Sequence, residues 1–233
     1  MKKWINTYIL SLRRDIVVLL IVDCVFLLLM ELVFKKIPAP FQVFVTLSNL
    51  AITLGISFIA SFIFYFVQVH LPETKQKTNL YPSISALYYR ILNTEKSFLT
   101  NFVGVKSFSE LTEDNILAGT KARDVNIKDA PLFLAGPNRN ANWMEYGFNE
   151  VDDIDKTWEM LMKYSSYLDS ECLSLLAEVQ SNGVFTFFRK MRGIYHTFSN
   201  GMNIRGFEKE YVELWHFIQS QEEYYTKVFK EYK

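Results

Sequence analysis

The stretch VFVTLSNLAITLGISFIASFIFYFVQV at residues 43–69 decides the fold, because it runs for 27 residues without a charged side chain. As an α-helix it would extend about 40 Å, which exceeds the roughly 30 Å hydrocarbon core of a bilayer. A second apolar run precedes it at residues 16–34, where only Asp23 and Glu31 carry charge. Two such runs in succession are untypical of a water-soluble protein, so the sequence predicts two transmembrane helices.

The residues between the two runs (35–42, KKIPAPFQ) contain two prolines and predict a tight turn, so residues 15–72 should form a transmembrane hairpin. The first run is too long for a signal peptide, carries two acids and lacks a small-x-small cleavage site, so we expect it to be retained. Four Lys/Arg precede it, and Lys75 and Lys77 follow the second run, whereas the turn holds two. The positive-inside rule places both termini of this multi-pass protein on the cytoplasmic side of the cell inner membrane.

Residues 1–14, ahead of the hairpin, show an amphipathic pattern. The apolar residues recur at helical spacing on one face, largely opposite Lys, Asn and Thr, and they are Trp4, Ile5, Tyr8, Ile9 and Leu12. Trp, Tyr, Lys and Arg are typical of the lipid headgroup region, so we expect an interfacial helix here. The alternative is a plain cytosolic extension of the first transmembrane helix.

Polar side chains within the two apolar runs are the first candidate functional residues. An ionised Asp such as Asp23 costs about 2.5–3.5 kcal/mol inside a bilayer, and it needs a partner, water or a proton. At the matching depth of the second run, polar residues step by four along one helix face: Asn49, Thr53, Ser57 and Ser61. Ala51 and Gly55 lie beside this row and permit close approach of another backbone.

Two interpretations of this arrangement stay open. In the structural interpretation the row packs on the first run, and Asp23 accepts hydrogen bonds from serine hydroxyls. In the functional interpretation Asp23 and the row line a pore or a proton path. The functional interpretation requires an oligomer, because two helices alone cannot enclose water.

Charge divides the chain into two parts, although its 25 basic and 25 acidic residues cancel. Through residue 80 there are eight Lys/Arg and four Asp/Glu, whereas residues 81–233 hold 17 and 21. Residues 73–80 are a short polar stretch that we expect to act as a linker. Residues 81–233 show apolar residues at helical period and no alternation of period two, so they predict a cytosolic all-α domain, a bundle of about five helices.

Local signals place the helices within this domain. Expected helices begin near Tyr81-Pro82, Thr112, Asp152–Asp155, Asp169, Val184 and Phe207. The three acids at 152, 153 and 155 suit a helix amino terminus, where negative charge complements the helix dipole. Residues 119–148 contain several Gly, Pro and Asn and predict a long loop, whose segment PLFLAG (131–136) should tuck into the core.

Composition and motifs argue against several function classes. The zero net charge disfavours a nucleic-acid partner, and the 50 % hydrophobic content excludes disorder. The two cysteines, Cys24 and Cys172, are too few for a disulfide scaffold or a four-thiolate zinc site. Glu213-x-x-His216 lacks the second Glu-x-x-His of a di-iron bundle, and no nucleotide-binding or G-x-S-x-G motif occurs. We therefore expect no cofactor and no metal, and nothing in the sequence argues for an enzyme.

One basic cluster in the domain has two interpretations. Arg189, Lys190 and Arg192 lie among aromatic residues of the helix expected from Val184. They are candidates for contact with anionic lipid headgroups, which a domain tethered to the inner leaflet would reach. In the alternative interpretation the aromatic residues belong to the core and the basic residues mark a solvated face.

Two strings and the overall layout carry a resemblance. The strings are FYFVQVHLPE (64–73) and WEMLMKYSSYLDSECLSLLAEVQ (158–180). Together with the two apolar runs they resemble uncharacterised bacterial two-span membrane proteins with a cytosolic helical region. The resemblance implies this location and fold, has no assigned activity and transfers no functional residues. The many Lys, Asn, Ile, Phe and Tyr residues are also typical of an AT-rich bacterial genome.

Two functional hypotheses result. In the first, the protein is a non-enzymatic membrane anchor or sensor whose cytosolic helices bind another protein or further copies of this chain. In the second, it is an oligomeric membrane-permeabilising effector, with Asp23 and the polar row in the membrane and the cytosolic bundle as trigger. The lipid bilayer is a partner in both.

Overall fold

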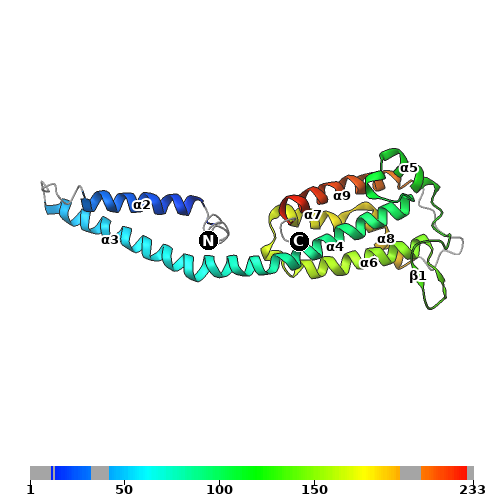
Figure 1. Cartoon of the computed structure of the whole chain (residues 1–233), viewed down its shortest axis with the longest axis horizontal. Coiled ribbons are helices and arrows are strands. Elements are labelled where there is room, and N and C mark those ends of the chain that lie inside the picture. The colour runs from blue at the N-terminus through cyan, green and yellow to red at the C-terminus, as the bar shows by residue number, and fades with distance from the viewer. Residues whose placement is uncertain (1–11, 13, 33–41, 195–205, 230–233) are drawn as a thin grey trace. The chain divides into compact units, whose positions relative to one another are not determined.

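The computed structural model describes residues 12, 14–32, 42–194 and 206–229. These residues are mostly helical with almost no sheet, which confirms the predicted all-α class (Figure 1). The chain divides into two compact units, Met1–Leu80 and Tyr81–Lys233. The expected turn at 35–42 and the expected interfacial helix at 1–14 lie almost wholly outside the described residues.

In the first unit, α2 (Arg14–Leu32) and α3 (Gln42–Tyr65) pack against each other at Gly55. A Cβ atom at Gly55 would lie 2.8 Å from Leu27 Cδ2 and 2.9 Å from Asp23 Oδ1, so this close approach requires glycine. Elsewhere the large apolar side chains of these helices face outward, and Phe64 is 67 % exposed. The unit thus has little apolar core of its own and presents an apolar surface.

One helical stretch among the described residues is long and apolar enough to cross a membrane. It covers Val45–Val103, and its qualifying window has a mean hydropathy of 2.3. Helix α2 does not meet this measure, because its 19 residues include four charged ones: Arg14, Asp15, Asp23 and Glu31. The structure therefore offers one such helix where the sequence analysis predicts two.

Helix α3 continues through a π-helical turn, η2 (Phe66–His70), directly into α4 (Leu71–Val103). The predicted helix start at Tyr81-Pro82 is wrong, because Pro82 lies inside α4, which already covers residues 73–80. Glu, Lys and Gln in this segment are good helix formers. Extending an existing helix also avoids the cost of a new nucleus, which explains why the polar stretch does not break it.

In the second unit, α4 and α9 (Glu208–Val228) form an antiparallel pair (Figure 1). Ring centroids of Tyr88 and Tyr224 lie 5.7 Å apart at one end, and those of Phe102 and Tyr211 lie 5.2 Å apart at the other. Between them, Gln221 of α9 donates a hydrogen bond to Glu95 of α4. The two helices therefore share a long, largely aromatic contact.

Helices α6 (Trp143–Met162), α7 (Ser170–Ser181) and α8 (Gly183–Arg192) complete the core around this pair. Phe98 and Phe188 are fully buried, with ring centroids 5.6 Å apart. Gly147 of α6 lies against Phe188, and an added Cβ would come within 2.2 Å of that ring. Helices α6 and α8 can approach so closely only because residue 147 has no side chain.

The expected loop at 119–148 is shorter in the structure, because α5 (Glu113–Ala122) and α6 cover its two ends and a small hairpin lies in its middle. Helix α5 occupies its start, and strands β1 (Phe133–Leu134) and β2 (Arg139–Asn140) form a short antiparallel hairpin. The PLFLAG segment does not enter the core, because it forms one arm of this hairpin and Phe133 is 60 % exposed. Short 3₁₀ turns, η3 (Phe108–Glu110) and η4 (Ser165–Tyr167), join the neighbouring helices.

Helix α6 begins nine residues earlier than the expected start at Asp152, which overturns the assignment of the three acids to a helix end. Asn142 accepts a hydrogen bond from the Glu145 backbone N–H, and the Glu145 carboxylate accepts one from the Asn142 N–H. This reciprocal capping box satisfies two free amides and defines the first turn. The expected starts of α5 at Thr112 and α7 at Asp169 are confirmed, since both residues cap those helices.

Arg123, which follows α5, joins three parts of the second unit. Its guanidinium donates to the main-chain carbonyls of Phe102 and Asn101 at the end of α4. The same group lies over the Trp143 ring, 3.9 Å from its centroid. It thereby satisfies carbonyls that a helix end leaves without partners.

Candidate functional site

Asp23 is the most unusual polar group of the α2–α3 contact. Its Oδ1 lies against Gly55, and its Oδ2 is buried without a hydrogen-bond partner among the described residues. The sequence predicts that serine hydroxyls supply that partner. They do not, because Ser57 and Ser61 donate instead to main-chain carbonyls one turn earlier in α3, each at 2.8 Å.

The polar row of α3 (Asn49, Thr53, Ser57 and Ser61) also lies elsewhere than the structural interpretation requires. All four residues are exposed, whereas Gly55 beside them is buried against α2. The row therefore does not pack on α2, and only the small-residue face does. The result is a line of polar groups on the outer surface of an otherwise apolar helix.

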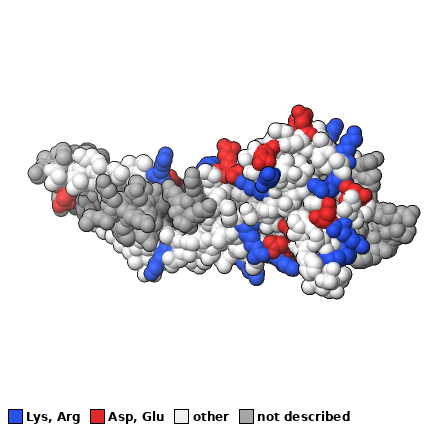
Figure 2. Space-filling model, turned by 45° about the vertical axis from the view of Figure 1, so that its right-hand side comes forward, with Lys and Arg blue, Asp and Glu red and all other residues white. Residues whose placement is uncertain are grey.

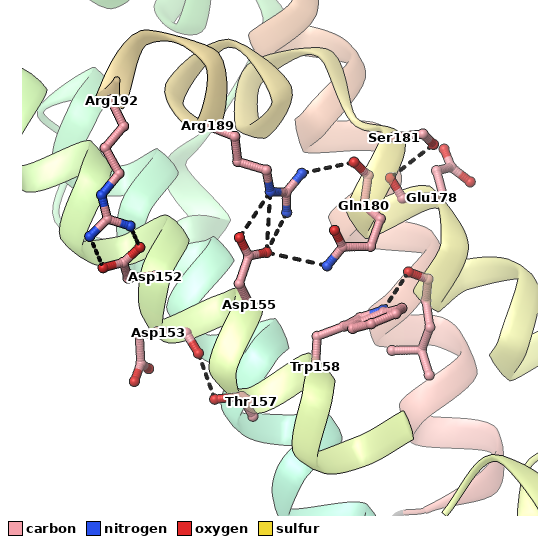
Figure 3. A network of polar contacts seen from close by, with 11 residues as sticks. Asp152, Asp153, Asp155, Thr157, Trp158, Glu178, Gln180, Ser181, Arg189 and Arg192 are labelled. Carbon is pink, nitrogen blue, oxygen red and sulfur yellow. Dashed lines mark hydrogen bonds and ion pairs between the residues drawn. The ribbon is translucent and has the colours of Figure 1, made fainter. Parts of the chain in front are cut away.

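Three aspartates of α6, Asp152, Asp153 and Asp155, form ion pairs with arginines of other helices. Figure 3 shows the pairs of Asp152 and Asp155 with α8. Asp155 accepts from Arg189 Nη2 at 2.6 Å and from Gln180 Nε2 at 3.2 Å, while Arg189 also donates to the Gln180 carbonyl at 2.8 Å. Both partners of the Asp155–Arg189 pair are largely shielded from solvent, which strengthens their attraction. The network ties α6 to α7 and α8.

Two further pairs extend this network toward solvent. Arg192 forms an ion pair with Asp152, and Arg90 of α4 forms one with Asp153. Both arginine side chains are more than half exposed, so these pairs contribute less than a shielded one. Together the three pairs explain why α6 carries acids in its middle, a role that the sequence analysis assigned to a helix end.

A cleft of about 170 Å³ lies at the surface of this network. Its lining mixes the ion pairs with an apolar floor: Phe148, Val151, Asp152, Asp155, Phe188, Arg189 and Arg192. Arg189 and Arg192, two of the three candidate headgroup ligands, are thus already paired with carboxylates, and Lys190 is exposed. Figure 2 shows both signs of charge interspersed on the face it presents of this unit. The expected headgroup contact stays a prediction.

A longer groove runs between α4 and α9. It comprises two adjoining hollows of about 260 and 330 Å³ that share Lys96 and Glu222. Lys96 forms an ion pair with Glu222 at 2.5 Å and lies over the Phe108 ring, 4.9 Å from its centroid. The remaining lining is rich in aromatic residues and amides: Tyr89, Leu92, Asn93, Ser109, Leu111, Trp215, Gln219, Tyr225 and Thr226. We call this surface the α4–α9 groove.

Beneath the groove lies a buried acid that the sequence analysis missed. Glu95 is fully buried, and its Oε2 accepts a hydrogen bond from Gln221 Nε2 at 2.6 Å. Burial raises the pKa of Glu95 to about 8, which the Gln221 hydrogen bond and the charge of Arg189 offset only in part. Its position four residues after Ile91, on the apolar face of α4, is the signal that could have identified it.

Other candidate chemistry is weak in the described residues. Burial raises the pKa of the Cys172 thiol to about 12, which disfavours the reactive thiolate. His216 is exposed and lies 3.3 Å from Gln219, so Glu213-x-x-His216 is a surface feature. Across the described ranges no three His, Cys, Asp or Glu side chains come together as a metal site would require.

Comparison with known proteins adds no relative: no family model, no curated protein and no solved structure matches the chain.

Proposed function

We propose that the protein is an integral, multi-pass protein of a bacterial inner membrane that presents a non-enzymatic helical interaction domain to the cytoplasm. The observation that carries the proposal is the surface of α3. Its uncharged sequence faces outward almost entirely, and Leu54 and Phe64 are 62 % and 67 % exposed. A soluble protein does not leave so long an apolar surface in water, whereas a bilayer requires it.

In this arrangement α2 is the second membrane helix. Its outward residues are apolar as well, for example Val22 at 59 % and Leu28 at 58 % exposure. The Gly55 contact supplies the close backbone approach that membrane helices use for association, because lipid offers no hydrophobic drive between them. The Lys/Arg bias of the sequence then puts both termini in the cytoplasm.

The interaction role is supported by the centre and the surface of the second unit. The centre is filled by aromatic side chains such as Phe98, Phe102 and Tyr211, which pack ring against ring. The α4–α9 groove joins two hollows of about 260 and 330 Å³ and exposes Tyr89 by 43 %. Aromatic residues around a groove are typical of protein interfaces.

The membrane location is tested by fractionation and proteolysis. The full chain should stay with membranes after an alkaline carbonate wash and dissolve only in detergent. Protease added to intact cells should leave the second unit undigested, and disrupting the membrane should expose it. Recovery in the soluble fraction, or digestion of the second unit from outside, would contradict the proposal.

The interaction role is tested by site-specific photocrosslinking in cells. A photoreactive residue at Tyr89, in the α4–α9 groove, should give a discrete adduct with one partner or with a second copy. Met160 of α6 is the matched control, since it is 38 % exposed and outside the groove. No adduct from Tyr89, or equal adducts from both positions, would argue against the groove as the interface.

A second function is favoured by the polar row of α3. Its four residues are exposed on an apolar helix, and the unpartnered Asp23 oxygen lies in the same unit. In an oligomer such groups would line a water-filled path, which fits a membrane-permeabilising effector.

Membrane potential measurements separate the two functions. A permeabilising effector should depolarise cells on expression, and Asp23→Leu should abolish the effect while leaving the protein in the membrane. An anchor should leave the potential unchanged in both forms. Depolarisation that survives Asp23→Leu would exclude Asp23 from the path.

A further inference from the structure

We propose that the α4–α9 contact is a pH-sensitive latch, in which one proton shared between Glu95 and Gln221 holds α9 on α4. The inference concerns the second unit alone and does not depend on the membrane location. It starts from two oxygen atoms that have no hydrogen-bond donor.

In the Glu95–Gln221 pair, two oxygen atoms lack a hydrogen-bond donor. Gln221 Nε2 donates to Glu95 Oε2 at 2.6 Å, yet Glu95 Oε1 and Gln221 Oε1 are both buried without a partner among the described residues. Both oxygens can only accept when the carboxyl group is ionised. A proton on Glu95 Oε1 converts it into a donor, and the amide oxygen of the same Gln221 is the acceptor. The acid and the amide then form a reciprocal pair that satisfies both groups.

The surroundings offer an ionised Glu95 no adequate alternative. Arg189 of α8 is the cation whose charge reaches it, but that guanidinium is held by Asp155 of α6 and by the Gln180 carbonyl. Tyr88 of α4 also interacts with Glu95, and its own environment is acidic, with Asp169, Glu171 and the Cys172 thiol of α7 nearby. None of these groups supplies the missing hydrogen-bond donor, and a buried, unpaired carboxylate is costly.

Release of the proton should therefore loosen α9. An ionised Glu95 regains solvation when water enters between α4 and α9, which local opening of α9 permits. The raised pKa of Glu95, about 8 in the folded protein against 4.5 as the ordinary value, sets the sign. The contribution to stability is complete below pH 4.5 and is lost as pH rises through about 8, because the folded state binds the proton more tightly.

Hydrogen–deuterium exchange of the full chain in detergent or nanodiscs tests the latch. After correction for the intrinsic exchange rate, protection of the α9 amides should fall about tenfold between pH 6 and pH 7, because opening releases one proton there, and it should level off above pH 8, where Glu95 is ionised in both states. Glu95→Gln keeps an amide pair without a charge, so its α9 protection should be flat over this range.

Glu150→Gln is the matched control, because burial also raises the pKa of Glu150, which lies on α6 and outside the α4–α9 contact. This variant should keep the pH dependence of α9. The proposal is overturned if wild-type α9 protection does not change between pH 6 and pH 9, or if Glu95→Gln retains the wild-type dependence.

A second measurement applies if Glu95→Gln does not fold. Infrared spectroscopy of the wild-type chain should show a protonated carboxyl band that disappears on titration near pH 8. A chain with no protonated carboxyl band at pH 7 would contradict the latch without any variant.

Discussion

The two units differ in where their large apolar side chains lie: at the surface in the first unit and in the core in the second. In α2 and α3 the apolar residues face outward and the contact between helices centres on Gly55 and Asp23. In the second unit most of the large aromatic residues lie inside, whereas most charged residues lie at or near the surface and several pair across helices. Both units use helices and a close contact at glycine, so they differ in where their apolar surface lies. Both units are helical, so the burial of the apolar side chains, rather than the helix content, distinguishes them.

The largest expected effect comes from removing an aromatic ring on each side of this contrast. Phe102→Ala empties a fully buried position and should lower the free energy of unfolding by about 3–5 kcal/mol. Phe64→Ala removes the same group from a position that is 67 % exposed, and it should change the stability of the second unit by less than about 0.5 kcal/mol. Denaturant unfolding followed by tryptophan fluorescence measures both. Similar losses of stability in Phe102→Ala and Phe64→Ala would contradict the difference in burial between the two units.

The ion pairs of α6 provide the next test. Asp155→Ala removes a shielded acceptor of Arg189 and Gln180 and should cost about 1.5–3 kcal/mol, as for hydrogen bonds to charged groups. Asp152→Ala breaks a pair whose arginine is more than half exposed, so its cost should be about 0.2–1 kcal/mol. Thermal unfolding in low and high salt checks the order. A larger loss for Asp152 would show that exposure does not rank these pairs.

Gly147 in the second unit and Gly55 in the first provide a further comparison of the two units. Gly147→Ala would push a methyl group into the Phe188 ring and should destabilise the second unit by about 1–3 kcal/mol. Gly55→Ala creates a similar clash with Leu27 and Asp23, but it should leave unfolding of the second unit unchanged and weaken the α2–α3 contact instead. Cysteine crosslinking between α2 and α3 measures the latter. An effect of Gly55→Ala on the second unit would contradict independent units.

The smallest effect concerns polar side chains. In the second unit Asn142 caps α6, and Asn142→Ala should cost about 1 kcal/mol. In α3 the Thr53 hydroxyl only donates to the Asn49 carbonyl of its own helix, so Thr53→Val should leave insertion and stability nearly unchanged. Asn149→Ala, at an exposed position inside α6, controls for helix propensity. Equal losses of stability in Asn142→Ala and Asn149→Ala would show that the Asn142 cap does not stabilise α6.

The sequence predicted helices well where capping and apolar spacing agree. Thr112 and Asp169 mark the starts of α5 and α7, because a side-chain oxygen must satisfy the first free amides of each helix. The uncharged run at residues 43–69 was sufficient by itself to predict the helix α3. In these elements the deciding interactions are local, so the residues that make them are neighbours in the chain.

The predictions failed where a residue's role depends on contacts far away in the sequence, or where one helix continues into the next. The acids of α6 pair with Arg90, Arg189 and Arg192, which lie 34 to 63 residues away, so their role was not visible locally. The start of α6 was visible in Asn142-x-x-Glu145, a capping-box spacing that the surrounding loop signals hid. The Tyr81-Pro82 pair predicts a helix start, but α4 begins at Leu71 and Pro82 lies inside it.

The candidate site was predicted only in part. Asp23 and the polar row were identified from sequence, but which of them faces α2 depends on packing at Gly55. Glu95 could have been found as a lone acid on the apolar face of α4. Its partner Gln221 lies 126 residues later, and nothing in the chain before α9 indicates that pairing.

Arg123 has a consequence for substitution at that position. Its planar, forked guanidinium donates to two carbonyls of α4 and at the same time lies over the Trp143 indole. Lysine carries the same charge but ends in a single compact ammonium, which cannot match this geometry. A change usually regarded as conservative would therefore leave the end of α4 frayed, and the loop after α5 would lose its attachment.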